Sequence, residues 1–173
     1  MAIKKVGVQP HQSMNFPPDA EIIFREWAVN STPITDVCST RVATRLPRNA
    51  QLPFLTFFNA GGTMLSPGGD ASIANTVINL NAFAGRWGGG SSSQPDYANA
   101  YALANAVAEA AFKTGKTIVH TASSETKAVI YGFDIVQLPE RVEETDTGLG
   151  LYRLSLNMYY RGIWYEQKNR SKS

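Results

Sequence analysis

Hydrophobic and polar positions alternate most regularly between residues 127 and 161. In the second half of this stretch, apolar side chains occupy every other position: Tyr152, Leu154, Leu156, Met158 and Tyr160. A period of two is expected of a β-strand with one buried face. The first half, residues 128–138, is apolar on both faces, which predicts a more central strand. The rest of the chain is expected to pack on this strand pair.

The connection between these two strands is acidic. Leu138-Pro139 is predicted to end the first strand, because proline cannot donate a ladder hydrogen bond. Residues 146–148, Asp-Thr-Gly, have the composition of a turn. The connection carries four carboxylates: Glu140, Glu143, Glu144 and Asp146. The spacing of these carboxylates matches no regular cation-binding loop, so we expect a solvated acidic loop or an acidic interface that faces a basic partner.

Helical periodicity occurs in two segments. The first follows Pro17-Pro18-Asp19 and ends at residues 30–33, and one further turn at residues 35–38 is compatible with the sequence. The second and principal helix runs from Tyr97 to about Lys113, with Asp96 as its cap and Gly115 after its end. Its apolar stripe is rich in alanine, which predicts close packing against a sheet.

Further strands are expected at residues 41–46, 52–59, 74–83 and 117–121, with loops at 61–69 and around the Gly/Ser-rich residues 88–93. The order is α-β-β-β-α-β-β-β. This order predicts an α+β fold, in which a mainly antiparallel sheet packs against two principal helices. A single domain over residues 1–173 is expected, with an N-terminal arm at 1–16, a core at 17–165 and a polar tail at 166–173.

Composition narrows the classes of function. Of the 173 residues, 17% are charged and the net charge is +2, whereas soluble proteins average about 25% charged residues. The low charge suits extensive protein–protein contact, and the near-neutral balance argues against a dedicated nucleic-acid binder. Cys38 is the single cysteine, which excludes an intramolecular disulfide. We expect no signal peptide and no membrane span, and hence synthesis in the cytoplasm.

The sequence offers little catalytic chemistry. Residues 114–117, Thr-Gly-Lys-Thr, resemble the end of a phosphate-binding loop but lack its first glycine and follow a helix rather than precede one. His11 and His120 have no carboxylate pattern around them, and no nucleophile motif such as G-x-S-x-G occurs. We therefore predict no enzyme activity, catalytic residue, cofactor or metal. A small-molecule-binding enzyme is kept as the alternative of a different class.

Arginines gather in the first third of the chain. Arg41, Arg45 and Arg48 fall within eight residues, and Arg86 lies further on. On a strand, Arg41 and Arg45 would share a face. Such a stripe is equally compatible with an ordinary solvated face and with a contact surface for a protein partner or a passing polyanion.

The order of these features resembles the tail-terminator (tail-completion, minor tail protein U-like) family of tailed bacteriophages. The resemblance covers residues 17–162 and rests on two Leu-Pro passages in RVATRLPRNAQLPFLTF (41–57), the strand ANTVINLNAF (74–83), the helix YANAYALANAVAEAAF (97–112) and the terminal LPERVEETDTGLGLYRLSLNMYYRG (138–162). The arm, the loops near residues 61–72 and 88–93, and the polar tail depart from the family pattern.

The resemblance implies a structural virion protein without catalysis. Members form a ring, usually a hexamer, on the last ring of the tail tube, stop tube growth and present the surface that joins the head. The implied partners are other copies of the chain, the tail tube protein and a head-completion or neck protein, with DNA passing through the lumen. Arg41, Arg45, Arg48 and Arg86 are then candidates for lumen or rim positions. A neck or connector adaptor is the alternative within the virion.

Overall fold

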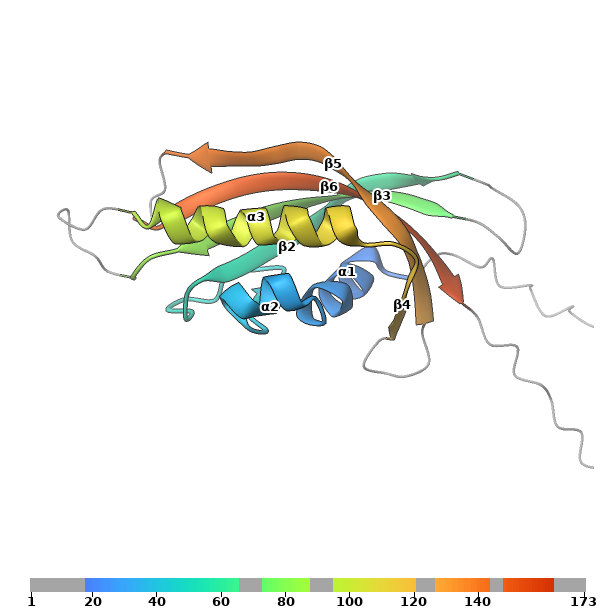
Figure 1. The fold of residues 1–173 in the computed structure, drawn as a ribbon, viewed down its shortest axis with the longest axis horizontal. Helices are drawn as coiled ribbons and strands as arrows, with labels where there is room; N and C mark the ends of the chain where they lie inside the picture. The colour runs from blue at the N-terminus through green and yellow to red at the C-terminus, as the bar shows by residue number, and fades with distance from the viewer. Residues whose placement is uncertain (1–17, 66–72, 88–94, 121–126, 144–147, 164–173) are drawn as a thin grey trace, which may run out of the picture.

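A computed structural model describes residues 18–65, 73–87, 95–120, 127–143 and 148–163. Three helices lie on one face of a curved six-stranded sheet (Figure 1). The predicted α+β class is thus confirmed. The first helical region forms two helices rather than one, so the element order is α1-α2-β1-β2-β3-α3-β4-β5-β6.

The sheet is mixed, and its strands are ordered β1-β2-β3-β6-β5-β4. Only the short pair β1–β2 is parallel; the other neighbours are antiparallel. The strands are β1 (Val42–Ala43), β2 (Phe54–Met64), β3 (Ala74–Ala84), β4 (Thr117–His120), β5 (Lys127–Val142) and β6 (Gly150–Ile163).

The central strand of the C-terminal pair is β6, not β5. β6 pairs along its length with β3 on one side and β5 on the other. β5 has β4 as a neighbour only over Lys127–Ile130, so its remaining length is a sheet edge among the described residues. The expectation of a more central first strand is therefore wrong. Pro139 does not end β5 either, because proline is tolerated in an edge strand.

Two predictions about the first strands need correction. The strand expected at 41–46 shrinks to Val42–Ala43. β2 continues through Gly61 and Gly62, which were expected in a loop. A Cβ at Gly62 would lie 2.1 Å from the Asn75 carbonyl oxygen, so only glycine allows this close approach of β2 and β3.

The helices begin where the sequence places their caps. An Asp19 carboxylate oxygen accepts from Glu21 N at 2.9 Å at the start of α1 (Ala20–Val29). Asp96 accepts from Asn99 N at 3.1 Å at the start of α3 (Tyr97–Lys113). Between them, α2 (Thr32–Cys38) has proline in its first turn, where a missing N–H is harmless.

The core lies between the helices and the sheet. Phe24 and Trp27 of α1 pack on Phe57 of β2 and Phe133 of β5, with ring centroids 4.4–6.4 Å apart. The Trp27 indole N–H donates to Thr114 Oγ1 at 3.1 Å, which ties α1 to the end of α3. The predicted alanine-rich face of α3 is buried against the sheet, as expected for close packing.

Candidate functional surfaces

The sheet face away from the helices carries a row of hydrogen-bonded polar side chains. In β3, Asn79 and Asn81 alternate with fully buried apolar residues. Ser155 Oγ donates to Asn79 Oδ1 at 2.7 Å, and Arg153 Nε donates to Asn81 Oδ1 at 3.2 Å. These cross-strand bonds pair Asn79 and Asn81 of β3 with polar side chains of β6. The alternation was visible in the sequence, but the partners on β6 were not.

The row continues toward β5 through Tyr159 and Asp134. The Tyr159 hydroxyl donates to Asp134 Oδ2 at 2.7 Å and accepts from Asn157 Nδ2 at 3.0 Å. The hydrogen bond to Asp134 raises the pKa of Tyr159 above its ordinary value. Asp134, an exposed carboxylate on β5, thus accepts a hydrogen bond from a tyrosine side chain. Among the described residues, no group of three or more His, Cys, Asp and Glu side chains could hold a metal.

The four predicted arginines do not form one stripe. Because β1 spans only Val42–Ala43, Arg41 and Arg45 do not share a strand face, and that expectation is wrong. Arg41 Nε donates to the Pro53 carbonyl oxygen at 2.9 Å, so this side chain fastens the start of β2. Arg45, Arg48 and Arg86 are exposed and form no ion pair with another described residue.

These three exposed arginines belong to neighbouring segments. Arg48 lies in the loop that leads from β1 to β2, and Arg86 follows β3. The Trp87 indole N–H donates to the Ala50 carbonyl oxygen at 2.7 Å, which joins the two segments at one end of the sheet. We call Arg45, Arg48 and Arg86 the basic corner.

The acidic segment lies at the same end of the sheet but beside its other edge. Val142, the last residue of β5, is opposite Leu151, while Ala84 at the end of β3 is opposite Gly150. Glu140 and Glu143 are exposed. Glu140 accepts from Gln137 Nε2 at 2.5 Å, and neither glutamate forms an ion pair with another described residue. Glu144 and Asp146 lie outside the described residues.

The end of β5 is held from its inner side. The Tyr97 hydroxyl donates to the Glu143 carbonyl oxygen at 3.0 Å, and the Arg141 guanidinium lies 3.8 Å above the Tyr97 ring. These contacts fix the acidic segment to the first turn of α3. They leave Val136 and Leu138 on the outer side, 58% and 71% exposed. Exposed apolar residues were not predicted here, because the all-apolar run indicated burial.

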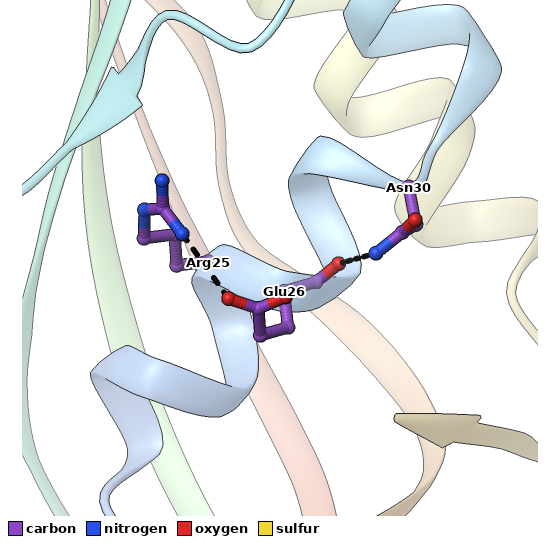
Figure 2. A network of polar contacts seen from close by, with 3 residues as sticks. All are labelled: Arg25, Glu26 and Asn30. Carbon is purple, nitrogen blue, oxygen red and sulfur yellow. Dashed lines mark hydrogen bonds and ion pairs between the residues drawn. The ribbon is translucent and has the colours of Figure 1, made fainter. Parts of the chain in front are cut away.

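A surface hollow of about 390 Å³ lies between α1 and β4. Glu26, which lines the hollow, pairs with Arg25 at 3.1 Å, and its backbone carbonyl accepts from Asn30 Nδ2 at 2.7 Å. Figure 2 draws both contacts. His120 is exposed and has no carboxylate partner among the described residues, so no positioned acid–base pair arises here. The lining residues are Glu26, Trp27, Asn30, Ser31, Thr117, Ile118, Val119 and His120.

Two other sequence features have structural roles. Residues 114–117 follow α3 and lead into β4, and Thr114 bonds Trp27, so this segment is a helix stop as predicted. Cys38 is fully buried, and burial raises the pKa of its thiol to about 11 against a smaller opposing effect of Arg41. Within the described part of the chain, no helix is long and apolar enough to cross a membrane.

Comparison with solved structures gives a likeness of fold. No protein-family model and no curated protein matches the chain. A solved chain from the virion of a native gene transfer agent particle superposes with a TM-score of 0.50 at 11% sequence identity. The alignment covers 87% of this chain and 98% of that chain. At this identity the likeness establishes a shared fold over nearly the whole of both chains.

Proposed function

We propose that this chain is a structural virion protein that forms a ring at the head-proximal end of a phage-like tail tube. The ring would end tube growth and present the surface that joins the head. The observation that carries the proposal is the fold likeness to a virion chain, which extends over 98% of that chain. The order of elements that resembles the tail terminators supports the same class independently of the superposition.

The surface chemistry supports an assembly role. The described sheet has one edge with exposed apolar and acidic residues and a distant corner with unpaired arginines. A chain that carries two different patches can bind its neighbour heterologously, and such contacts close into rings when the rotation allows. The hollow between α1 and β4 is lined by a glutamate that is ion-paired with Arg25 and by a histidine without a carboxylate partner among the described residues, which gives the enzyme alternative little support.

The proposed partners are further copies of this chain, the tail tube protein and a head-completion protein. Contact with DNA in the lumen would rest on arginines, since phosphate contacts are independent of sequence and sensitive to salt. A quadruple variant in which Arg41, Arg45, Arg48 and Arg86 become glutamine tests this part. Reduced retention of packaged DNA is expected; unchanged infectivity and DNA retention would remove DNA contact from the proposal.

Native mass spectrometry of the purified chain, with negative-stain images of the same sample, tests the ring. Closed rings of about six subunits are expected. The same measurement with purified tail tubes added asks whether a ring closes only on the tube end. A chain that binds heads but not tubes would instead be a neck or connector adaptor, and a chain that binds neither and stays monomeric would refute the virion role.

A further inference from the structure

The two long outer strands, β2 and β5, are each covered along only part of their outer edge. Beside β2, β1 pairs with Leu55 and Thr56, and a Glu21 carboxylate oxygen accepts from Asn59 N at 2.9 Å. Beside β5, β4 covers only Lys127–Ile130, and no described strand follows. A sheet edge of this kind offers a binding surface to another chain.

The backbone of the open part of β5 is irregular, which favours contact through side chains over the addition of another strand. Its pairing with β6 shifts register between Ile130 and Gly132, between Ile135 and Gln137, and between Gln137 and Glu140. Bulges twist an edge away from further pairing, and Pro139 has no N–H to donate. The irregular segment nevertheless presents apolar Val136 and Leu138 beside acidic Glu140 and Glu143. We call these four residues the β5 outer edge.

The basic corner has the complementary charge but forms no ion pair with the β5 outer edge of its own chain among the described residues. In the strand order, β3 and β6 separate β2 from β5. Arg45 and Arg48 precede β2, which lies three strand spacings, or roughly 14 Å, from β5, whereas Arg86 follows β3, which lies two spacings, or roughly 10 Å, from β5. Three arginines and two glutamates thus remain without ion pairs among the described residues. Two separate, complementary patches at one end of the sheet favour a heterologous contact between copies.

We propose that the basic corner (Arg45, Arg48, Arg86) of one copy docks on the β5 outer edge (Val136, Leu138, Glu140, Glu143) of the next. This inference rests on the proposed ring and specifies its subunit contact. In that contact the arginines pair with the two glutamates, so this inference assigns Arg45, Arg48 and Arg86 to the contact between subunits in place of the DNA-facing lumen. Val136 and Leu138 are covered, which removes exposed apolar area from water. The occupant is a second copy because the matching charge is present on the same chain.

Charge exchange between the patches tests the proposal. The edge variant is Glu140→Lys with Glu143→Lys, and the corner variant is Arg45→Glu, Arg48→Glu and Arg86→Glu. Each variant alone would carry like charges on both patches, so the concentration for half-maximal assembly should rise by about a hundredfold. Mixed in equal amounts, the two variants should assemble again in alternation. A chain with both sets of changes should assemble by itself.

Matched controls keep the result specific. Lys116→Glu reverses an exposed charge far from both patches, and Phe112→Ser removes an apolar side chain that is 83% exposed on α3. Both should assemble as the wild type does, whereas Val136→Ser with Leu138→Ser should not. Thermal unfolding of every variant verifies the fold, which exposed substitutions should leave intact.

The outcomes separate this inference from the function on which it rests. If the wild type assembles, alone or on tail tubes, and either charge variant assembles equally well, the docking contact is overturned. The ring proposal then still stands. Loss of assembly in both variants without recovery on mixing would overturn the docking contact as well. A wild type that never self-associates in either condition would overturn the ring, and the contact with it.

Discussion

The contact between Gly150 and the start of α3 allows a sharp test of the fold. A Cβ built on Gly150 would lie 2.4 Å from the Asp96 carbonyl oxygen, 2.5 Å from its carbon and 2.8 Å from Tyr97 N. All three atoms are backbone, so no rotamer change relieves the clash. Gly150→Ala must therefore move either the first residue of β6 or the capped end of α3.

The expected loss of stability in Gly150→Ala follows from these two possible movements. Overpacking of this kind destabilises proteins by about 1–3 kcal/mol. Losing the Asp96 cap of α3 would add about 1 kcal/mol. Since each kcal/mol lowers the Tm of a chain of this size by about 2–4 °C, a fall of at least about 2 °C is expected, and of at least about 4 °C where the cap is lost as well.

Gly115→Ala is the matched control for this experiment. A Cβ on Gly115 meets no atom within 4 Å, and the residue lies outside the helices and strands. Its Tm should change little. Thermal unfolding followed by circular dichroism, with urea titrations for the free energy of unfolding, measures both variants. If Gly150→Ala were as stable as Gly115→Ala, the close packing of α3 on β6 would be wrong.

Three further predictions concern buried polar groups. Thr114→Val leaves the Trp27 indole N–H without its acceptor and should lower the free energy of unfolding in urea by about 1–3 kcal/mol; an unchanged value would speak against this bond. The Cys38 thiol, with its pKa raised to about 11 by burial, should react with a thiol reagent at pH 8 only after unfolding, so rapid labelling of the native protein would contradict its burial. Burial, aided by Asp19, raises the pKa of Tyr160 to about 12. Its unfolded form ionises near pH 10, so the associated stability should be present below pH 10 and lost as pH approaches 12, and a Tyr160→Phe variant with the same pH profile would refute this.

Local signals in the sequence were sufficient for the helices. Asp19 and Asp96 carry the side-chain oxygens that the first turns require, and both act as caps in the structure. The period of two in β6 was equally informative, because one face of that strand packs on the helices while the other meets the polar row. Each of these features depends on residues close in sequence, and each was predicted.

The position of β5 depends on distant contacts and was not predicted. Phe133 is apolar because it packs on Trp27 of α1, with ring centroids 4.4 Å apart. Val136 and Leu138 are apolar but exposed at an edge. An apolar run on both faces indicates burial on both faces only if another strand covers the edge, and β4 is too short to do so. Nothing in the local sequence reveals the length of that cover.

The same limit applies to the arginines. Arg41 was grouped with its neighbours by spacing, yet it bonds the Pro53 carbonyl oxygen and protects the start of β2. Arg48 and Arg86 are far apart in sequence and come to one end of the sheet through the Trp87–Ala50 bond. The sequence therefore indicated which residues were basic, but only the tertiary contacts separated Arg41, which is hydrogen-bonded to Pro53, from the arginines that form no ion pair among the described residues.

The inner contacts of β5 bear on how tightly its outer edge could bind. The Tyr97 hydroxyl donates to the Glu143 carbonyl oxygen, and the Arg141 guanidinium lies above the Tyr97 ring. Gly150 allows the same turn of α3 to pack closely on β6. Residues 140–143 are therefore held in place from the side that faces the core of their own chain, before any partner arrives. A surface fixed in this way loses less conformational entropy on docking than a mobile loop would. Because the bulges and Pro139 discourage strand addition, binding at this edge should be selected by charge and shape, which favours a closed assembly over continued sheet growth.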